Sequence, residues 1–315
     1  MRAKPFYTYT QQIEELEKYK GLIIPDKSKA KAYLRDVGYF KLIGGGKDLL
    51  RLNTGKYIAG VSFDDVIALY EFDNMMREIF FHYICLIEKK LRSVISYEFC
   101  KVHGENQAEY LNKNNYKHIV SNKERRDLKR FLDKMIDLAN SNKKYPFINY
   151  QRSTYNNVPL WVLVNAMTFG ELSKMYDFLD MTMRYKISTN FENISPSELA
   201  KYLKVLGLFR NVCAHHERFY AHVVHVDIPD TLLHLRLGIP KNNKTYNLGK
   251  KDVFSLVIAF KYFLTKQDFL IFKQSISKVI AKFLNDNSVV NEQELLLKMG
   301  FPNNWKSITR YRKIR

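Results

Sequence analysis

Cysteine is scarce in this chain of 315 residues, which contains only Cys85, Cys100 and Cys213. Their odd number and wide spacing exclude a structural C-x-x-C zinc site and are typical of a protein from a reducing cytoplasm. No segment reaches about 18 uninterrupted apolar residues, so we predict no transmembrane helix. The first residues, MRAKPFYTYTQQIEEL, lack the apolar core of a signal peptide, and we therefore expect none.

Acidic residues are few relative to basic ones. The chain has 32 Asp and Glu against 51 Lys and Arg, which gives a formal net charge of +19. Such an excess favours a polyanionic partner, with nucleic acid as the first candidate and a membrane surface as the second. A hydrophobic content of 46% with 26% charged residues is that of a soluble globular protein, and the length allows one large or two ordinary domains.

Residues 1–60 contain signals for short helices and loops. Thr8 and Gln11 fit a capping box, and Asp26 fits the N-cap of a second helix. The three glycines at 44–46, followed by Lys47, lack the G-x-x-x-x-G-K-S/T spacing of a phosphate-binding loop, so a flexible loop is the better prediction. We also expect a short hairpin around 53–55.

The stretch LGLFRNVCAHHERFY, residues 206–220, combines helical periodicity with a cluster of polar side chains. With Asn211 at zero and about 100° per residue, His215 falls at about 40° and His216 at about 140°. His215 therefore shares a polar stripe with Asn211, whereas His216 is expected among apolar side chains as a core histidine. Arg210 lies at the edge of the stripe, and its long side chain can swing over it.

A strong helix start precedes this stretch. Ser195 fits an N-cap, Pro196 the first helical position, and Glu198 the third. The helix that they open is expected to continue through Tyr220, so that the polar cluster sits on a rigid element. Gly207 weakens such a helix by roughly 1 kcal/mol relative to alanine, and the close approach of another helix or of a ligand backbone would explain its presence.

Arg210, Asn211 and His215 include neither a carboxylate pair nor a metal-ligand set. An imidazole can accept or give a proton near neutral pH, and an arginine matches phosphate oxygens and stabilises a phosphorane-like transition state. The asparagine can orient either group. Together they suit metal-independent cleavage of RNA, in which the 2′-hydroxyl attacks its own phosphodiester. Because Arg and His are common on polar helix faces, the spacing alone is a weak signal.

The longest helical stretch begins at Ser62 and Asp65 and is apolar around much of its circumference. This pattern predicts a central helix covered by its neighbours, either unbroken or divided in two. Arg77, Glu88 and Arg92 fall roughly on one face of it. They form either a salt-bridge ladder or, in the functional alternative, a group in which Glu88 and Arg92 flank the Arg210–His215 cluster and help to position RNA.

The segment 103–157 is polar and strongly basic, and a helix is predicted at 123–134. Its basic residues, interleaved with tyrosines, could bind a phosphate backbone and stack bases, or the segment is a solvated insertion. The RNA-binding candidates here are Lys123, Arg125, Arg126, Lys129 and Arg130, to which we add Arg77 and, in the basic C-terminal tail, Arg310, Arg312 and Lys313.

Pro159 and the residues after it predict a helix that is broken at Gly170. After residue 229, the amphipathic run at 252–284 predicts two further helices.

The motif Arg210-Asn211-x-x-x-His215 resembles the R-N-x-x-x-H motif of HEPN-domain ribonucleases. Residues 209–218, FRNVCAHHER, resemble the L-R-N-x-x-A-H-H-x-R block of abortive-infection (Abi, AbiD/AbiF-like) bacteriophage-defence proteins. The likeness extends to separated blocks in the same order, at 21–45, 87–95 (I-E-x-x-L-R-x-x-I), 158–176 (with P-x-W and T-F-G-x-L-S) and 300–305 (G-F-P-x-x-W).

The resemblance implies an all-α fold, a HEPN-like helical bundle with additional N-terminal and C-terminal helices. An N-terminal helical segment would occupy 1–60 and the HEPN-like core 61–315, with the basic insertion at 103–157. His215 would donate or accept a proton, Arg210 would contact the scissile phosphate, and Asn211 would orient them. The supporting residues would be His216, Arg218, Glu88 and Arg92. No cofactor and no metal is expected.

HEPN ribonucleases commonly build one site from two motifs that face each other across a dimer. This sequence has one motif, so the resemblance implies a symmetric homodimer. Members of the Abi family also associate with small noncoding RNAs, which the basic charge would suit.

Three functions remain open. The chain is an RNA endonuclease toxin restrained until infection, an RNA-binding subunit of a ribonucleoprotein that does not cut, or an effector that binds phage components or a membrane surface. A steep salt dependence of RNA binding would separate the first two from the third.

Overall fold

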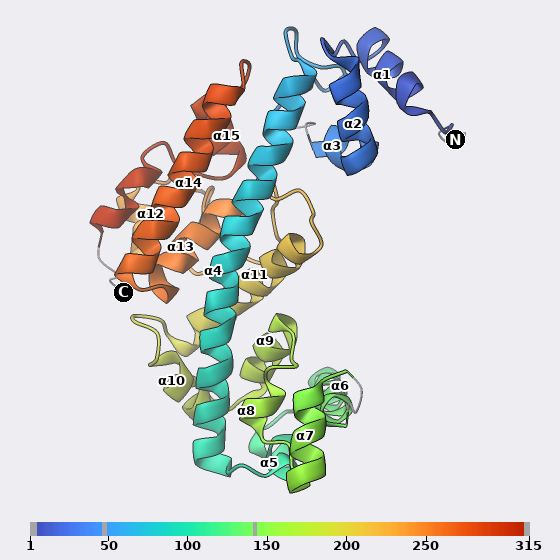
Figure 1. Ribbon diagram of the computed structural model, residues 1–315. Coiled ribbons are helices and arrows are strands. Elements are labelled where there is room, and N and C mark those ends of the chain that lie inside the picture. The colour runs from blue at the N-terminus through green and yellow to red at the C-terminus, as the bar shows by residue number, and fades with distance from the viewer. Residues whose placement is uncertain (1–4, 46–48, 141–143, 312–315) are drawn as a thin grey trace.

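A single helix of 41 residues, α4 (Phe63–His103), runs through the length of the molecule (Figure 1). A capping box begins it: the Ser62 hydroxyl accepts from the Asp65 N–H, and the Asp65 carboxylate accepts from the Ser62 N–H. At 1.5 Å per residue the helix is about 60 Å long. It is unbroken, so of the two alternatives for this stretch the single helix is correct.

The computed structural model describes residues 5–45, 49–140 and 144–311. Helices dominate these residues, and the sheet among them is a two-stranded antiparallel ribbon of β1 (Lys241–Asn242) and β2 (Thr245–Tyr246). The predicted all-α fold is confirmed. None of the described helices is both long and apolar enough to cross a membrane.

Three groups of helices surround α4. The group before it comprises α1 (Tyr9–Lys18), α2 (Lys27–Val37) and α3 (Tyr39–Gly45). The group that follows comprises α5 (Gln107–Leu111), a 3-10 helix (Lys113–Asn115), α6 (Asn122–Ala139), α7 (Pro146–Tyr155), α8 (Leu160–Leu163), α9 (Phe169–Phe178) and α10 (Met181–Ser188). The last comprises α11 (Pro196–Ala214), α12 (Leu232–Arg236), α13 (Val253–Phe263), α14 (Lys266–Asp286), α15 (Glu292–Lys298) and a 3-10 helix (Trp305–Arg310).

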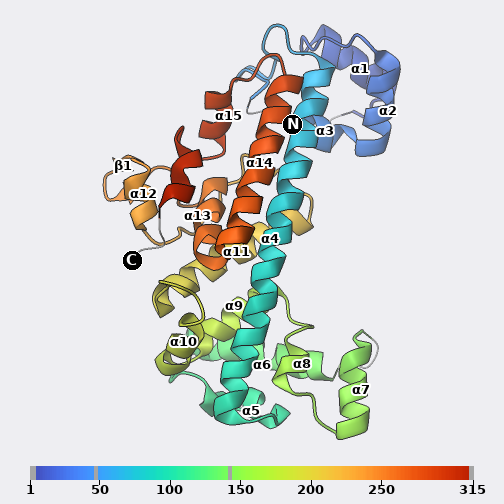
Figure 2. The ribbon, with the colours of Figure 1, turned by 60° about the vertical axis from the view of Figure 1, so that its left-hand side comes forward.

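Helix α14 packs along α4 in the antiparallel direction (Figures 1 and 2). At one end of the pair the Asp65 carboxylate accepts from the backbone N–H of Ser288, just after α14, at 3.0 Å. Aromatic rings fill the seam, including Phe80 against Phe272 with ring centroids 5.1 Å apart. Such buried rings contribute much of the apolar area that stabilises a core.

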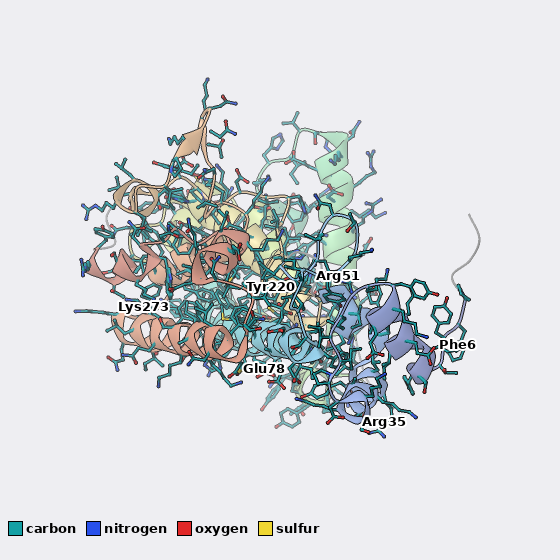
Figure 3. All side chains as sticks on the ribbon, turned by 90° about the horizontal axis from the view of Figure 1, so that it is seen from above. Phe6, Arg35, Arg51, Glu78, Tyr220 and Lys273 are labelled. Carbon is teal, nitrogen blue, oxygen red and sulfur yellow. The ribbon has the colours of Figure 1, made fainter. Side chains whose placement is uncertain are left out.

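The other side of α4 is covered by α3, by α8 and α9, and by the end of α11 (Figure 1). Seen from above, the N-terminal helices with Phe6 and Arg35 lie on one side of α4, and Lys273 of α14 lies on the opposite side (Figure 3). The two sides of α4 therefore differ: one packs against α14, and the other meets α3, α8, α9 and the end of α11.

Most predictions for the N-terminal residues are confirmed, but the flexible loop predicted from the glycine run is wrong at Gly44 and Gly45, which are helical. Thr8 forms the capping box of α1, and the Asp26 carboxylate caps α2. Arg51 and Tyr57 form an antiparallel bridge around the expected hairpin turn. The glycine run is divided, because Gly44 and Gly45 end α3 while Gly46 and Lys47 lie outside the described residues.

The predicted break at Gly170 is wrong. Helix α8 already ends at Leu163, and Gly170 lies in the first turn of α9. Thr168 caps α9 through a capping box with Glu171, whose carboxylate accepts from the Thr168 N–H at 2.6 Å. The cap, which satisfies two N–H groups at the helix start, decides this boundary. Two helices, α13 and α14, are confirmed in the run at 252–284.

The basic insertion is helical, and the helix predicted at 123–134 is confirmed within α6. Leu128, Phe131 and Met135 are buried on its inner side. The basic side chains project outward and are exposed: Lys123, Arg125, Arg126, Lys129 and Arg130.

His234 of α12 is fully buried, and its contacts fix the neutral ring. Its Nδ1 accepts from the Thr231 N–H at 3.2 Å, so Nε2 carries the hydrogen and donates to the Gly249 carbonyl at 3.0 Å. A proton added at Nδ1 would point at the hydrogen of the Thr231 N–H, and the two would repel each other. Burial lowers the pKa of His234 to about 4.

This histidine makes the stability depend on pH. Between pH 7 and pH 5 the unfolded ring, with a pKa of about 6.5, takes up a proton that the folded ring does not, so acid favours unfolding. We expect the free energy of unfolding to fall by about 2 kcal/mol over this window through His234 alone. Chemical denaturation of wild type and His234→Gln at pH 7 and pH 5 measures this fall. The free energy of unfolding of the variant should fall by about 2 kcal/mol less than that of wild type. Equal falls in the two proteins would show that His234 is not the group responsible.

Candidate functional site

Helix α11 carries the motif and is held tightly in the core. Its start is the predicted one: Ser195 caps it, Pro196 follows, and Glu198 completes the capping box. Gly207 lies at its contact with α9, where a Cβ atom on Gly207 would be 3.2 Å from the Phe169 ring. The close approach of another helix, predicted from this glycine, is confirmed.

The helix ends at Ala214, six residues before the predicted end. His215 is its C-cap and donates its backbone N–H to the Asn211 carbonyl at 2.9 Å. His216 has a φ of 52°, in the left-handed region, which turns the chain away from the helix axis. The prediction that His216 is a core histidine is therefore wrong: both histidines are exposed, because the helical wheel does not apply beyond Ala214.

A buried carboxylate holds the turn after the helix. Asp73 of α4, 7% exposed, accepts from the backbone N–H groups of Phe219 and Tyr220 at 2.8 and 2.7 Å. The Arg77 guanidinium donates to Asp73 at 2.9 Å and to the Glu217 carbonyl at 3.1 Å. Burial raises the pKa of Asp73 above its ordinary value, while the Tyr220 N–H and the Arg77 charge oppose that rise.

A cavity of about 630 Å³, here called the His215 cavity, opens between α3, α4 and this turn. Its apolar wall includes Leu42, Val66 and Leu69. Its charged and polar lining is Lys41, Asp73, Asn74, Arg77, Glu78, His215, His216, Glu217 and Arg218. Phe40 also lines it, with 88% of the residue exposed. The volume is that of a small-ligand site.

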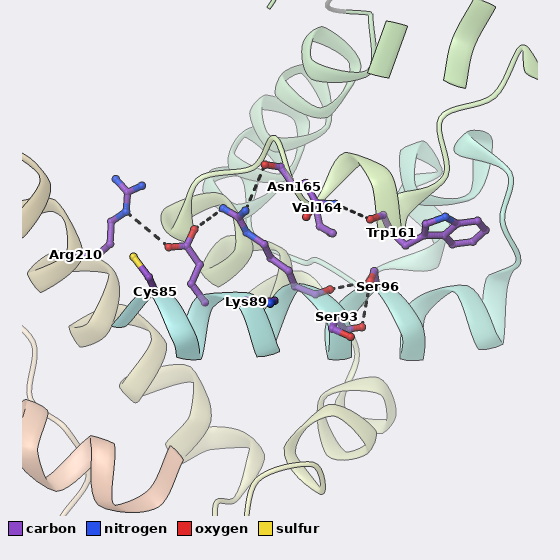
Figure 4. Close-up of a pocket in the computed structure, with 10 residues that line it drawn as sticks. Cys85, Lys89, Ser93, Ser96, Trp161, Val164, Asn165 and Arg210 are labelled. Atoms are coloured by element: carbon purple, nitrogen blue, oxygen red, sulfur yellow. Dashed lines mark hydrogen bonds and ion pairs between the residues drawn. The ribbon is translucent and has the colours of Figure 1, made fainter. Parts of the chain in front are cut away.

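A second cavity, of about 510 Å³ and here called the Arg210 cavity, lies further along α4 (Figure 4). Glu88, 5% exposed, pairs there with Arg92 at 2.5 Å and with Arg210 at 3.8 Å. Arg92 also donates to the carbonyls of Asn165 and Met167, at 3.3 and 2.8 Å. Glu88 and Arg92 thus form an ion pair beside Arg210, and a role of these two residues in positioning RNA stays a prediction.

The structure separates Arg210 from His215. Arg210 lines one cavity, His215 lines the other, and Asn211 is exposed but lines neither. Arg77, which the sequence placed on one face with Glu88 and Arg92, belongs to the His215 cavity instead of to their cluster. Within one chain, the motif therefore opens onto two neighbouring cavities.

The cysteines near the site are not activated. Burial and the Glu88 charge raise the pKa of Cys85, which lines the Arg210 cavity, and burial raises that of Cys213 to about 12. A thiol is a nucleophile as its thiolate, so neither group suits covalent catalysis near neutral pH. In residues 5–45, 49–140 and 144–311, no three or more His, Cys, Asp or Glu side chains are grouped to hold a metal ion.

The remaining predicted residues lie apart from these cavities. The five basic residues of α6 are exposed on the insertion, and Arg310 is exposed in the final 3-10 helix. Arg312 and Lys313 lie outside the described residues.

Sequence reasoning did not single out Asp73, Phe40 or Trp161. A carboxylate four residues before Arg77 on an otherwise apolar helix was a usable signal for Asp73. Trp161 was noted only as the tryptophan of the P-x-W block, and Phe40 had no signal, because an exposed aromatic residue looks like a core residue in a sequence.

Comparison with protein families gives one match. The model of a family described as "Abi-like protein" matches residues 32–221, more than half of the chain, and the matched part includes α4 and α11. Comparisons with curated proteins and with solved structures give no match.

The Asp73 contacts predict a local change in dynamics. In Asp73→Ala the N–H groups of Phe219 and Tyr220 lose their acceptor, so their amide hydrogens should exchange at least about tenfold faster, equivalent to about 1.4 kcal/mol. Hydrogen exchange with mass spectrometry over 215–222 measures this. Glu78→Ala, which removes an exposed carboxylate from the same helix, is the matched control and should leave the exchange of that peptide unchanged.

The Glu88 cluster predicts a change in stability. Glu88→Ala removes a buried carboxylate and leaves Arg92 and Arg210 without their counter-ion, so the free energy of unfolding should fall by about 3 kcal/mol. Urea denaturation beside Glu78→Ala provides the measurement. A loss no larger than that of the control would show that the two arginines do not depend on Glu88.

Proposed function

For a chain that belongs to the Abi-like protein family, we propose that it binds RNA and cleaves it without a metal ion, as a HEPN-type endoribonuclease. Membership of the family indicates a role in abortive infection, a bacterial defence against phage. The proposal further includes a homodimer and an association with a small noncoding RNA. It rests on the geometry at the end of α11, together with the formal charge of +19.

The observation that carries the proposal is the position of His215. A general acid or base must reach its substrate, and His215 is exposed at the rim of a cavity of substrate size, at the end of a helix fixed in the core. In the reaction the 2′-oxygen forms a bond to phosphorus while the bond to the 5′-oxygen breaks. One His215 imidazole takes the 2′-hydroxyl proton. The protonated His215 imidazole of a second copy of the chain gives its proton to the leaving 5′-oxygen, and Arg210 stabilises the charge on the phosphate oxygens.

In a homodimer, Arg210 of one copy and His215 of the other could lie at the same site. In one chain these side chains line different cavities. A two-fold axis near the end of α11 would bring two copies of the motif face to face, so that two histidines and two arginines serve one phosphodiester. The exposed Asn211, which lines neither cavity, is free to contact the other copy or the RNA.

The second candidate function is RNA binding without cleavage, as a subunit of a ribonucleoprotein. The row of exposed basic side chains on α6 favours it, because this row lies on the insertion, away from the motif. Such a surface binds the phosphate backbone whether or not the motif is catalytic.

Cleavage tests the proposal directly. We expect purified protein to cut single-stranded RNA in the presence of EDTA, leaving 2′,3′-cyclic phosphate ends. His215→Ala should lower the rate by about 10²- to 10⁴-fold, the range of a general acid or base. His225→Ala, which removes another exposed histidine ten residues further on, is the matched control and should cut normally. Electrophoresis of end-labelled RNA gives the rates.

Three results would bear on the proposal. RNA that binds to wild type and to His215→Ala but is cut by neither would favour the non-catalytic subunit. Cutting that stops in EDTA would contradict a metal-independent mechanism. Protection against phage plaques by wild type, with loss in His215→Ala only, would link the cleavage to defence.

A further inference from the structure

The His215 cavity and the Arg210 cavity lie along the same side of α4. Residues of α4 that line the first include Asn74 and Arg77, and those that line the second include Cys85, Glu88 and Arg92. Spacings of three, four and eight residues keep such positions on one helix face. The turn between them carries Phe81, with the Arg210 guanidinium carbon 6.0 Å from its ring centroid. The two cavities therefore lie one after the other along one side of α4, with Arg210 over Phe81 on the stretch between them.

Each cavity has an exposed aromatic residue in its lining. Phe40 in the His215 cavity is 88% exposed, and Trp161 in the Arg210 cavity is 49% exposed. Trp161 stands at the far end of its cavity from Arg210 (Figure 4). Exposed aromatic rings beside cationic groups are the elements with which proteins bind single-stranded nucleic acid, because a base stacks on the ring while its phosphate meets the cation.

The charges of the two cavities differ. The lining of the His215 cavity contains three Lys and Arg (Lys41, Arg77, Arg218) and three Asp and Glu (Asp73, Glu78, Glu217). The lining of the Arg210 cavity contains three Lys and Arg (Lys89, Arg92, Arg210) and one carboxylate (Glu88). A balanced, partly apolar cavity suits a base, and a cationic one suits phosphates.

We propose that the side of α4 between Phe40 and Trp161 is one track for single-stranded RNA, in which these two rings stack bases on either side of Arg210. The track rests on the proposed RNA-binding function and adds to it two base-stacking residues and the path of the strand. From Asn74 to Arg92 the track measures about 27 Å at 1.5 Å per residue, which several nucleotides of extended strand can follow. Bases in a duplex are already stacked on each other, so the track selects unpaired strands.

The chain contains a built-in probe for this track. It has two tryptophans, Trp161 and Trp305, and Trp305 is fully buried. A base that stacks on Trp161 quenches its fluorescence, whereas Trp305 is out of reach of RNA. The probe RNA is a 2′-O-methyl hexauridylate, which cannot be cut because the attacking hydroxyl is blocked. Its binding is followed by tryptophan fluorescence and, independently, by anisotropy of a dye-labelled copy.

We expect the oligonucleotide to quench wild-type fluorescence in step with the anisotropy signal. Phe40→Ala and Trp161→Ala should each weaken binding about 5- to 150-fold, the range for loss of one stacked base. Trp161→Phe should keep the affinity within about threefold and lose the quenching, since the phenyl ring still stacks. Tyr97→Ala, an exposed aromatic residue of α4 that lines neither cavity, is the matched control and should bind as wild type does. Circular dichroism confirms that each variant is folded.

Other outcomes would overturn the track. Binding by anisotropy without quenching, or with wild-type affinity in Phe40→Ala and Trp161→Ala, would place RNA elsewhere and leave the proposed RNA binding intact. Equal quenching by a duplex of the same sequence would refute selection of unpaired strands. Absence of binding to any RNA would overturn the proposed function and the track together, whereas loss of cleavage alone would not affect the track.

Discussion

The carboxylate of Asp73 is the contact on which the site depends. It joins α4 to the turn after α11 by accepting two backbone N–H groups and the Arg77 guanidinium. These bonds compensate a buried carboxylate that would otherwise be costly. Together with the Arg77 bond to the Glu217 carbonyl, they fix the turn with His215 and His216 relative to α4. The longest helix of the molecule therefore sets the position of the candidate catalytic residues.

Further along α4, the buried carboxylate of Glu88 holds Arg210 of α11 as Asp73 holds the turn after α11. Its carboxylate faces both Arg92 and Arg210, and Arg92 extends the network to the carbonyls of Asn165 and Met167. The network orients an arginine from α11 without neutralising all the positive charge of the cavity. An arginine so held can meet a phosphate with little further loss of side-chain freedom. The candidate catalytic groups are thus arranged along α4 by two acidic residues.

This arrangement connects the proposed chemistry with the proposed substrate path. The lining of the His215 cavity is balanced in charge and partly apolar, and the lining of the Arg210 cavity is cationic. A single strand that follows α4 would meet an aromatic ring, then the motif, then a second aromatic ring. The exposed basic side chains of α6 would add attraction for the phosphate backbone at longer range. In the proposed function, cleavage, binding and strand selection would be separable properties of this surface.

The sequence by itself determined the helices and the residue types of the site. Capping residues and apolar periodicity placed α1, α2, α4, α6, α11, α13 and α14, because those signals act within one or two turns of the chain. The blocks from Arg210 to His215 and from Glu88 to Arg92 identified the family and its polar cluster. Tertiary structure alone decided that α11 ends at Ala214, because Asp73, more than a hundred residues earlier, binds the turn that follows. It also decided that both histidines are exposed and that Arg210 and His215 open onto different cavities. Contacts between distant segments leave no local periodicity, so no helical wheel could show them.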